Sequence, residues 1–143
     1  MGTELLTKLA IINEISKIII YDNLSRGHRS LFLGNKSTFL SKIVFVHGEI
    51  LDSRLLKKQL NDADVIVNLA AMVTTPFANT DPHFFEQVNH WGTAEVVYAA
   101  EDSRVSKFIY LSSTAVYGTG ADLANESTLP SPQTHYGISK LMG

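Results

Sequence analysis

A tyrosine and a lysine at residues 136 and 140 have the spacing of an acid–base pair. In Tyr136-Gly137-Ile138-Ser139-Lys140 the two are four residues apart, so on a helix both side chains lie on one face. A free phenol has a pKa near about 10, too high for a base at neutral pH, and an ammonium group beside it favours the phenolate. The pair predicts proton transfer by Tyr136, although the same spacing also occurs on solvated helix faces.

Two serines follow the apolar run that precedes this pair. Residues 107–111 predict a strand that runs into Ser112 and Ser113, and open α/β sheets bind ligands at the carboxyl ends of their strands. In the functional interpretation, the Ser113 hydroxyl holds a substrate oxygen beside the Tyr136 phenol. In the structural interpretation, Ser113 is a turn or cap residue.

Strands and helices alternate along the chain, and this alternation predicts how the side chains are positioned. Apolar runs typical of buried strands lie at 17–21, 42–46, 65–69 and 107–111. Helical patterns lie at 5–15, 52–60, 84–101 and from 134 onward. Strands that are apolar throughout and separated by helices indicate a parallel sheet covered on both faces. The predicted fold class is therefore α/β, with a doubly wound parallel sheet.

Composition argues against several classes of function. The 143 residues carry 12 Lys and Arg against 14 Asp and Glu, a formal charge of −2. Without a basic block, neither nucleic acid nor a membrane surface is favoured as a partner. No apolar run approaches the roughly 20 residues that span a bilayer. A small-molecule or protein partner is expected instead, and the length predicts a single domain.

Cysteine and histidine usage limits the chemistry further. The sequence has no cysteine, which excludes disulfides and thiolate chemistry and is typical of the reducing cytoplasm. No metal site is expected, because metal-ligand spacing is missing among His28, His47, His83, His90 and His135.

The segment around the serines and the tyrosine resembles a known family. The residues that carry the likeness are Phe108-Ile109-Tyr110-Leu111-Ser112-Ser113-Thr114-Ala115-Val116-Tyr117-Gly118, then Glu126, Pro130 and the motif at 136–140. They are similar to the extended short-chain dehydrogenase/reductases, especially the NAD-dependent epimerase/dehydratase branch that acts on nucleotide sugars. The resemblance implies a Rossmann-like fold, NAD as cofactor and a nucleotide-sugar substrate. It also implies that Tyr136 is the catalytic base or acid, that Lys140 lowers its pKa and holds the nicotinamide ribose, and that Ser113 orients the substrate.

The resemblance extends upstream and implies a set of cofactor-binding residues. Asp22 ends a predicted strand, where a carboxylate binds the adenosine ribose and repels the extra phosphate of NADP; a lone Asp there is otherwise a turn former. Glu49 stands where the family usually has Asp near the adenine, and Asn89 is implied to help position the active site. The full implied set is Gly2, Asp22, Asn23, Glu49, Ile50, Leu69, Ala70, Ala71, Asn89, Ser112, Tyr136 and Lys140.

The glycine-rich phosphate loop of the family is incomplete in this sequence. Only Gly2 aligns with it, as its third glycine, and the strand that precedes the loop in the family is not present. Because that strand is central in the order 3-2-1-4-5-6, we expect two half-sheets with a gap between them. Residues 1–143 are then a partial NAD(P)-binding Rossmann domain without its substrate domain. The alternative is a compact natural variant that closes its sheet by rearrangement or by pairing with another chain.

One departure discriminates between reactions. The 4,6-dehydratases of the family have Thr-Asp-Glu where this chain has Ser113-Thr114-Ala115, so the carboxylates that protonate and deprotonate the sugar are missing. Dehydration is disfavoured, which leaves epimerisation or carbonyl/alcohol redox. A hypothesis of a different class is a non-catalytic nucleotide-binding or interaction module. For the isolated chain we expect very weak or no NAD binding and no turnover.

Aromatic residues mark one predicted helix. Phe84, Phe85 and Trp91 occur at helical spacing with Val88, which predicts packing in the core or at an interface. In epimerases of the resembled family this helix often packs in the four-helix bundle of a dimer. The resemblance therefore implies a possible homodimer through the helix Phe84–Glu101.

Overall fold

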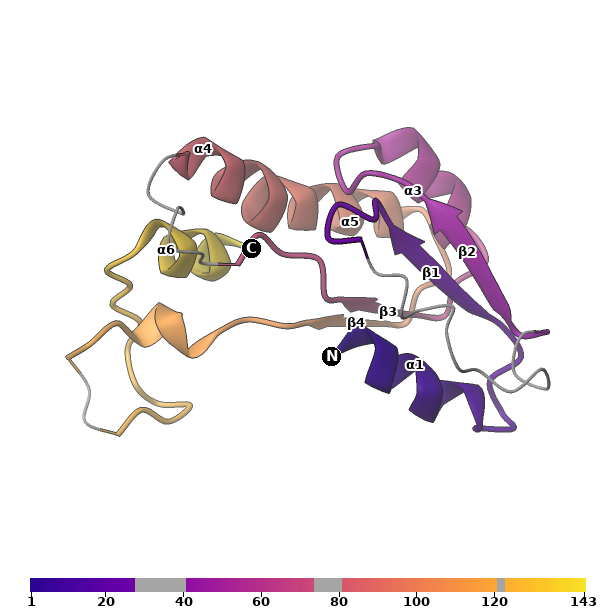
Figure 1. Cartoon of the computed structure of the whole chain (residues 1–143), viewed down its shortest axis with the longest axis horizontal. Coiled ribbons are helices and arrows are strands. Elements are labelled where there is room, and N and C mark those ends of the chain that lie inside the picture. The colour runs from indigo at the N-terminus through magenta and orange to yellow at the C-terminus, as the bar shows by residue number, and fades with distance from the viewer. Residues whose placement is uncertain (28–40, 74–80, 121–122) are drawn as a thin grey trace. The chain divides into compact units, whose positions relative to one another are not determined.

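The computed structural model describes residues 1–27, 41–73, 81–120 and 123–143 (Figure 1). The chain divides into two compact units, Met1–Glu49 and Ile50–Gly143. Within the described ranges, no helix has the length and apolar character needed to cross a membrane.

The described part of the first unit contains one helix and one pair of parallel strands. Helix α1 (Gly2–Ala10) buries Leu6 and Ala10, and strand β1 (Ile18–Asp22) pairs with β2 (Ile43–His47) so that Ile18 lies opposite Ile43. The helix predicted over 5–15 is wrong beyond Ala10. The β-branched isoleucines that follow disfavour a helix, and the backbone closes single turns instead, with Ile12 N 3.1 Å from Leu9 O.

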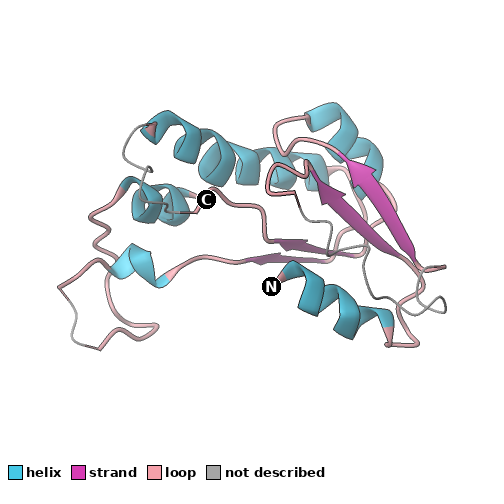
Figure 2. Ribbon diagram, viewed as in Figure 1, coloured by secondary structure: helices cyan, strands magenta, loops and turns pink. Residues whose placement is uncertain are grey.

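The second unit packs helices against another parallel pair. Strand β3 (Val65–Asn68) pairs with β4 (Lys107–Tyr110) so that Val65 lies opposite Lys107. Its described helices are α3 (Ser53–Leu60), α4 (Pro82–Phe85), the π-helix η3 (Glu86–Trp91), α5 (Gly92–Glu101), the 3-10 helix η4 (Thr114–Tyr117) and α6 (His135–Met142). Helices α4, η3 and α5 follow one another without a break (Figure 2), and we call this continuous segment, Pro82–Glu101, the central helix. Helix α3 packs against α5, and α6 packs against η3 and η4.

Capping side chains explain where the helices of this unit begin. Asp52 Oδ1 accepts a hydrogen bond from Leu55 N at 3.0 Å, and Thr134 Oγ1 accepts one from Gly137 N at 3.0 Å. Short polar side chains of this kind satisfy the free N–H groups of the first helical turn. The predicted helix starts near residues 52 and 134 are confirmed.

The sheet is divided as the sequence predicted, but its faces are not both covered. The described strands form two separate two-stranded sheets, β1-β2 and β3-β4. Along β4, Phe108 and Tyr110 are partly buried, whereas the alternating Ile109 is 45% exposed, and Val65 of β3 is 51% exposed. Successive strand side chains point to opposite faces, so only one face of the β3-β4 pair is covered. The prediction of a sheet covered on both faces is wrong at these positions.

The core of the second unit lies between its helices and the covered face of β3 and β4. Its buried apolar residues are Leu56, Ile66, Phe85, Val96, Ala99 and Val116. Phe84 and Trp91, by contrast, are 45% and 55% exposed. Of the aromatic residues predicted to pack in the core or at an interface, only Phe85 belongs to the core.

Candidate active site

Helix α6 carries the tyrosine and the lysine of the predicted acid–base pair. Tyr136 is partly exposed and Lys140 is 3% exposed. The Tyr136 ring meets the edge of Phe85, with centroids 6.3 Å apart and planes at 67°. A Cβ atom on Gly137 would lie 2.5 Å from Ala115 O, so only glycine allows α6 to approach η4 this closely. The motif therefore fixes the position of α6 as well as supplying the side chains of Tyr136 and Lys140.

Lys140 contacts residues at the end of strand β4. Lys140 Nζ lies 4.1 Å from the ring centroid of Tyr110. The carbonyl oxygen of Lys140 accepts hydrogen bonds from Tyr110 Oη at 3.3 Å and from Ser112 Oγ at 3.4 Å. Burial lowers the pKa of Lys140 to about 8, because desolvation penalises the charged form. Burial also raises the pKa of Tyr110 above its usual 10.0.

A fully buried asparagine joins α6 to the loop after β3. Asn89 is 0% exposed, and its Oδ1 accepts a hydrogen bond from Met72 N at 2.8 Å. Its Nδ2 donates to Met72 O at 3.0 Å and to Ser139 Oγ at 2.9 Å. Asn89 lies in the π-helix η3, a type of helical turn that is frequent at functional sites. The Asn89 side chain thus makes three hydrogen bonds through which it could position α6 and the loop after β3.

Nearly all buried polar groups of the described structure belong to one cluster around these contacts. Asn68 Nδ2 donates to Thr93 Oγ1 at 3.2 Å, Thr93 Oγ1 donates to Asn89 O at 2.7 Å, and Ser139 Oγ donates to Tyr136 O at 2.9 Å. The buried polar or charged residues of the described ranges are Asn68, Asn89, Thr93, Ser139 and Lys140. We call the hydrogen-bonded chain Asn68–Thr93–Asn89–Ser139 the buried network. It connects β3, the central helices and α6.

Ser113 follows strand β4, as predicted, and acts as a cap residue, the structural interpretation of its position. It precedes η4 as its N-cap, and its Oγ accepts a hydrogen bond from Ala115 N at 3.2 Å. No hydrogen bond joins its hydroxyl to that of Tyr136 among the described residues. Ser113 therefore caps a turn in this structure, and a substrate role remains a proposal.

Three of the predicted cofactor-binding residues come together at the carboxyl ends of β1 and β2. Asn23 Nδ2 donates to both carboxylate oxygens of Glu49, at 2.9 and 3.0 Å. Asp22 Oδ1 accepts a hydrogen bond from Leu24 N at 2.7 Å, which is the turn-forming role weighed for it. Polar side chains at the ends of parallel strands are where such sheets bind ligands.

The other predicted cofactor residues lie at helix starts and strand ends. Gly2 is the first residue of α1. Ile50 packs against Gly92, where a Cβ atom would lie 2.7 Å from Ile50 Cγ2. Leu69, Ala70 and Ala71 follow β3 directly, and Ala70 N donates to Asn68 Oδ1 at 3.2 Å.

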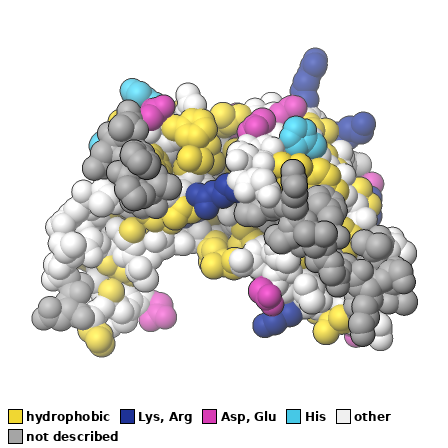
Figure 3. Space-filling model, viewed as in Figure 1, with side chains coloured by type: hydrophobic (Ala, Val, Ile, Leu, Met, Phe, Trp, Pro, Cys, Tyr) yellow, Lys and Arg dark blue, Asp and Glu magenta, His cyan; other side chains and the backbone are white. Residues whose placement is uncertain are grey.

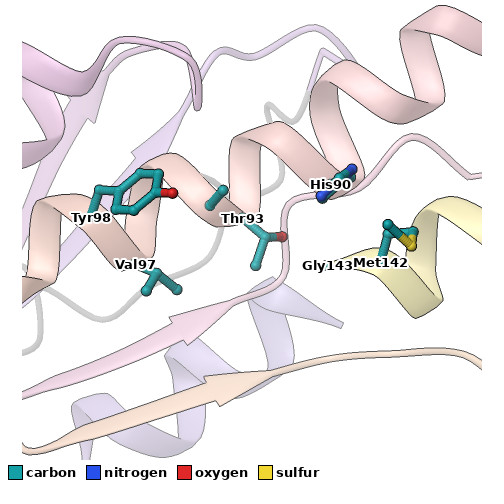
Figure 4. Close-up of a pocket in the computed structure, with 7 residues that line it drawn as sticks. His90, Thr93, Val97, Tyr98, Met142 and Gly143 are labelled. Carbon is teal, nitrogen blue, oxygen red and sulfur yellow. The ribbon is translucent and has the colours of Figure 1, made fainter.

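A hollow of about 180 Å³ opens beside the central helix, away from the predicted catalytic residues. Figure 4 shows its lining from η3, α5 and the end of α6, namely His90, Thr93, Val97, Tyr98, Met142 and Gly143, together with Ala94. Neither Tyr136, Lys140 nor Ser113 lines it. Among the described residues, which leave out His28, no group of three or more His, Asp or Glu side chains could hold a metal ion.

Sequence reasoning missed Tyr110, Thr93 and Ser139 as members of the site. Thr93 follows Asn89 by four residues, and Ser139 sits inside the Tyr136–Lys140 motif. These spacings place each residue beside a predicted site residue on its helix. Tyr110 gave no comparable signal, because its contact with Lys140 joins a strand to a helix 30 residues away.

Comparison with known proteins finds relatives along the whole chain. The profile described as the NAD dependent epimerase/dehydratase family matches residues 1–143. The human dTDP-D-glucose 4,6-dehydratase is 34% identical over 99 residues, which cover 67% of this chain and 28% of that protein. The UDP-glucose 4-epimerase of Halalkalibacterium halodurans is 26% identical over 138 residues, which cover 94% of this chain and 39% of that protein.

Among solved structures, the UDP-glucuronic acid 4-epimerase from Bacillus cereus, in complex with NAD, matches with a TM-score of 0.80 at 27% identity. The match covers 99% of this chain and 46% of that one. The chain thus spans less than half the length of these relatives.

Proposed function

Because the chain belongs to the NAD-dependent epimerase/dehydratase family, we propose that it carries the proton-transfer residues of an NAD-dependent epimerase or oxidoreductase of nucleotide-linked sugars. The observation that supports this most directly is the state of Lys140. It is 3% exposed, its pKa is lowered to about 8, and it lies on the same helix as Tyr136. Burial of an ammonium group is costly, so a lysine in this state is a candidate for a functional role.

The residues present fit NAD in part. In the first unit, Asp22, Asn23 and Glu49 offer carboxylate and amide groups at strand ends, and we propose that they bind the adenosine, with Gly2 near the pyrophosphate. Ile50, the first residue of the second unit, is proposed to contact the adenine. In the second unit, Lys140 would hold the nicotinamide ribose. The backbone at Leu69–Ala71 and the Ser112 hydroxyl would line the cofactor, with Asn89 fixing that loop through Met72. When bound, NAD supplies the hydride acceptor.

The side chains of α6 and η4 divide the remaining work. Tyr136, as the phenolate, takes the proton of a sugar hydroxyl. The carbon that bears this hydroxyl becomes a ketone as the hydrogen on that carbon leaves as a hydride to the acceptor. The ammonium of Lys140 stabilises the phenolate by its charge. Ser113 donates a hydrogen bond to the same sugar oxygen, which it can do while its Oγ still accepts from Ala115 N. Reduction from the opposite face completes an epimerisation, and release of the ketone completes an oxidation.

The residues after Ser113 favour epimerisation or simple redox over dehydration. Loss of water from a sugar needs groups that protonate the leaving hydroxyl and remove a second proton. The positions where the family's 4,6-dehydratases have carboxylates are Thr114 and Ala115 here. We therefore propose that the chain differs in reaction from its human dehydratase relative.

A non-catalytic nucleotide-binding module is the second candidate. It is favoured by the single glycine, Gly2, that stands for the family's glycine-rich loop, since that loop binds the pyrophosphate through its backbone. Calorimetry with NAD on the isolated chain separates the candidates. We expect very weak or no binding and no turnover from it, whereas micromolar binding would show that the rest of the loop is dispensable.

The exposed aromatic side of the central helix supports a homodimer. Phe84, Trp91 and Tyr98 recur every seven residues and are 45%, 55% and 56% exposed, and Figure 3 shows hydrophobic side chains at the surface over this helix. Large aromatic residues of this kind are enriched at protein interfaces. We propose that Phe84–Glu101 packs against the same helix of a second copy.

The substitution Tyr136→Phe tests the proposed reaction. It removes the proton acceptor and keeps the ring against Phe85, so turnover of a nucleotide sugar by the full protein should fall at least about 100-fold, the range of general acid–base catalysis. Tyr98→Phe is the matched control, because it removes an exposed phenol outside the site and keeps the ring in the proposed dimer contact, so it should keep wild-type turnover. Wild-type turnover in Tyr136→Phe would refute the mechanism.

A further inference from the structure

We propose that Tyr110 is a positioning residue for Lys140, which it holds at both ends, by the face of its ring and by its hydroxyl. The inference rests on the proposed function, in which Lys140 acts on the Tyr136 phenol. Tyr110 lies on strand β4, outside the motif that contains both residues.

The ring of Tyr110 faces the lysine's charged tip. Lys140 Nζ lies 4.1 Å from the ring centroid, well within the roughly 6 Å over which an aromatic face attracts a cation. Within the described part of the chain, Nζ makes no hydrogen bond, and the residue is 3% exposed. The negative face of the ring is therefore placed to stabilise the ammonium form against the effect of burial.

The hydroxyl of Tyr110 fixes the lysine's backbone. Tyr110 Oη donates to Lys140 O at 3.3 Å. Lys140 lies in the last turn of α6, which ends at Met142, and the last four carbonyls of a helix have no partner within it. One side chain thus satisfies a free carbonyl at one end of Lys140 and contacts its charge at the other.

Strand β4 connects Tyr110 to the buried network. Tyr110 is the last residue of β4 and pairs with Asn68 of β3, and Asn68 is part of the buried network through its bond to Thr93. The same network reaches Ser139, the neighbour of Lys140, through Asn89. The ring and the helix that bears the lysine are therefore tied to the same buried groups.

Tyr110 itself is unsuited to proton transfer. Burial raises its pKa above the usual value, an effect larger than the opposing contact with the Thr93 hydroxyl. It therefore stays a neutral phenol and keeps donating to Lys140. The partly exposed Tyr136 remains the phenol that a substrate can reach.

Fluorinated phenylalanines at position 110 separate the ring from the hydroxyl. In the full protein, Tyr110→Phe keeps the ring, and mono-, di- and trifluorophenylalanine then withdraw its negative charge at nearly constant shape. The readout is the pKa of Lys140, followed by NMR of its labelled side chain without substrate or cofactor and assigned with Lys140→Arg. From phenylalanine to trifluorophenylalanine this pKa should fall stepwise by roughly 0.5 to 1, the size of a cation–π contact.

The same series at Phe108, on the same strand and without contact to Lys140, is the matched control and should leave that pKa unchanged. A flat series at position 110, or an equal fall in the Phe108 series, would overturn the role of Tyr110. The lysine titration needs no turnover, so it is decided separately from Tyr136→Phe. If both proposals hold, the pH profile of kcat moves with the Lys140 pKa along the series.

Discussion

The substitution Asn89→Ala tests the importance of the buried network for stability. Asn89 is 0% exposed and makes three side-chain hydrogen bonds, to Met72 N at 2.8 Å, to Met72 O at 3.0 Å and to Ser139 Oγ at 2.9 Å. A buried hydrogen bond contributes about 1 kcal/mol net, and a buried polar group left without a partner costs about 1 to 3 kcal/mol. We therefore expect the free energy of unfolding to fall by about 3 kcal/mol or more.

Urea unfolding followed by tryptophan fluorescence measures this loss. Trp91 is the only tryptophan of the chain and lies in the same π-helix as Asn89, so its signal reports on the unit that contains the network. Far-ultraviolet circular dichroism, recorded in parallel, shows whether the helices unfold in the same transition.

Asn125→Ala is the matched control. Its side chain is exposed and closes a local turn by accepting a hydrogen bond from Ser127 N at 2.9 Å. Removal of a surface turn of this kind should cost within about 0.5 kcal/mol. If Asn89→Ala costs no more than Asn125→Ala, the network does not hold α6 to the loop after β3, and this interpretation of the site is refuted.

Three further predictions concern pH, cofactor choice and assembly. The pKa of Lys140 is lowered from 10.5 to about 8, so between these pH values the unfolded chain binds a proton that the folded chain lacks. Stability therefore rises with pH in this window. In urea titrations, the free energy of unfolding of the wild type should rise by roughly 2 to 3 kcal/mol relative to Lys140→Met between pH 8 and pH 10. Asp22→Asn keeps the oxygen that accepts from Leu24 N and removes the charge, so calorimetry of the full protein should show a weaker preference for NAD over NADP at unchanged stability; an unchanged preference would exclude Asp22 from the ribose site. Trp91→Glu should convert the proposed homodimer into monomers in light scattering after size-exclusion chromatography, and a persistent dimer would place the interface elsewhere.

The sequence was sufficient to predict the strands and the order in which helices separate them, whereas proton transfer by Tyr136 and Lys140 stays a prediction. Each strand lies within one residue of its predicted range at either end, because the apolar runs are short and bounded by polar residues. The capping residues Asp52 and Thr134 likewise mark helix starts through a local bond that the sequence displays directly. Features that depend on neighbouring residues, such as strand bounds and helix caps, could therefore be predicted from the sequence.

What depends on tertiary contacts was not visible. The periodicity of 84–101 predicted one regular helix, but the structure inserts the π-helix Glu86–Trp91, which places Asn89 against Met72 and Ser139. The exposure of Val65 and Ile109 depends on which elements cover each face of a strand. The contact between Tyr110 and Lys140 joins residues 30 apart in the sequence. Packing decides such features, and local propensity carries no trace of them.

The most direct test of the proposed reaction is the reduction of nicotinamide by substrate within one turnover. The full protein, loaded with NAD and mixed with excess nucleotide sugar, is followed by the near-ultraviolet absorbance of reduced nicotinamide. The proposed mechanism predicts that this absorbance appears in the wild type and is lost or slowed at least about 100-fold in Tyr136→Phe. Product formation without any reduced nicotinamide in the wild type, or an unchanged rate in Tyr136→Phe, would contradict it.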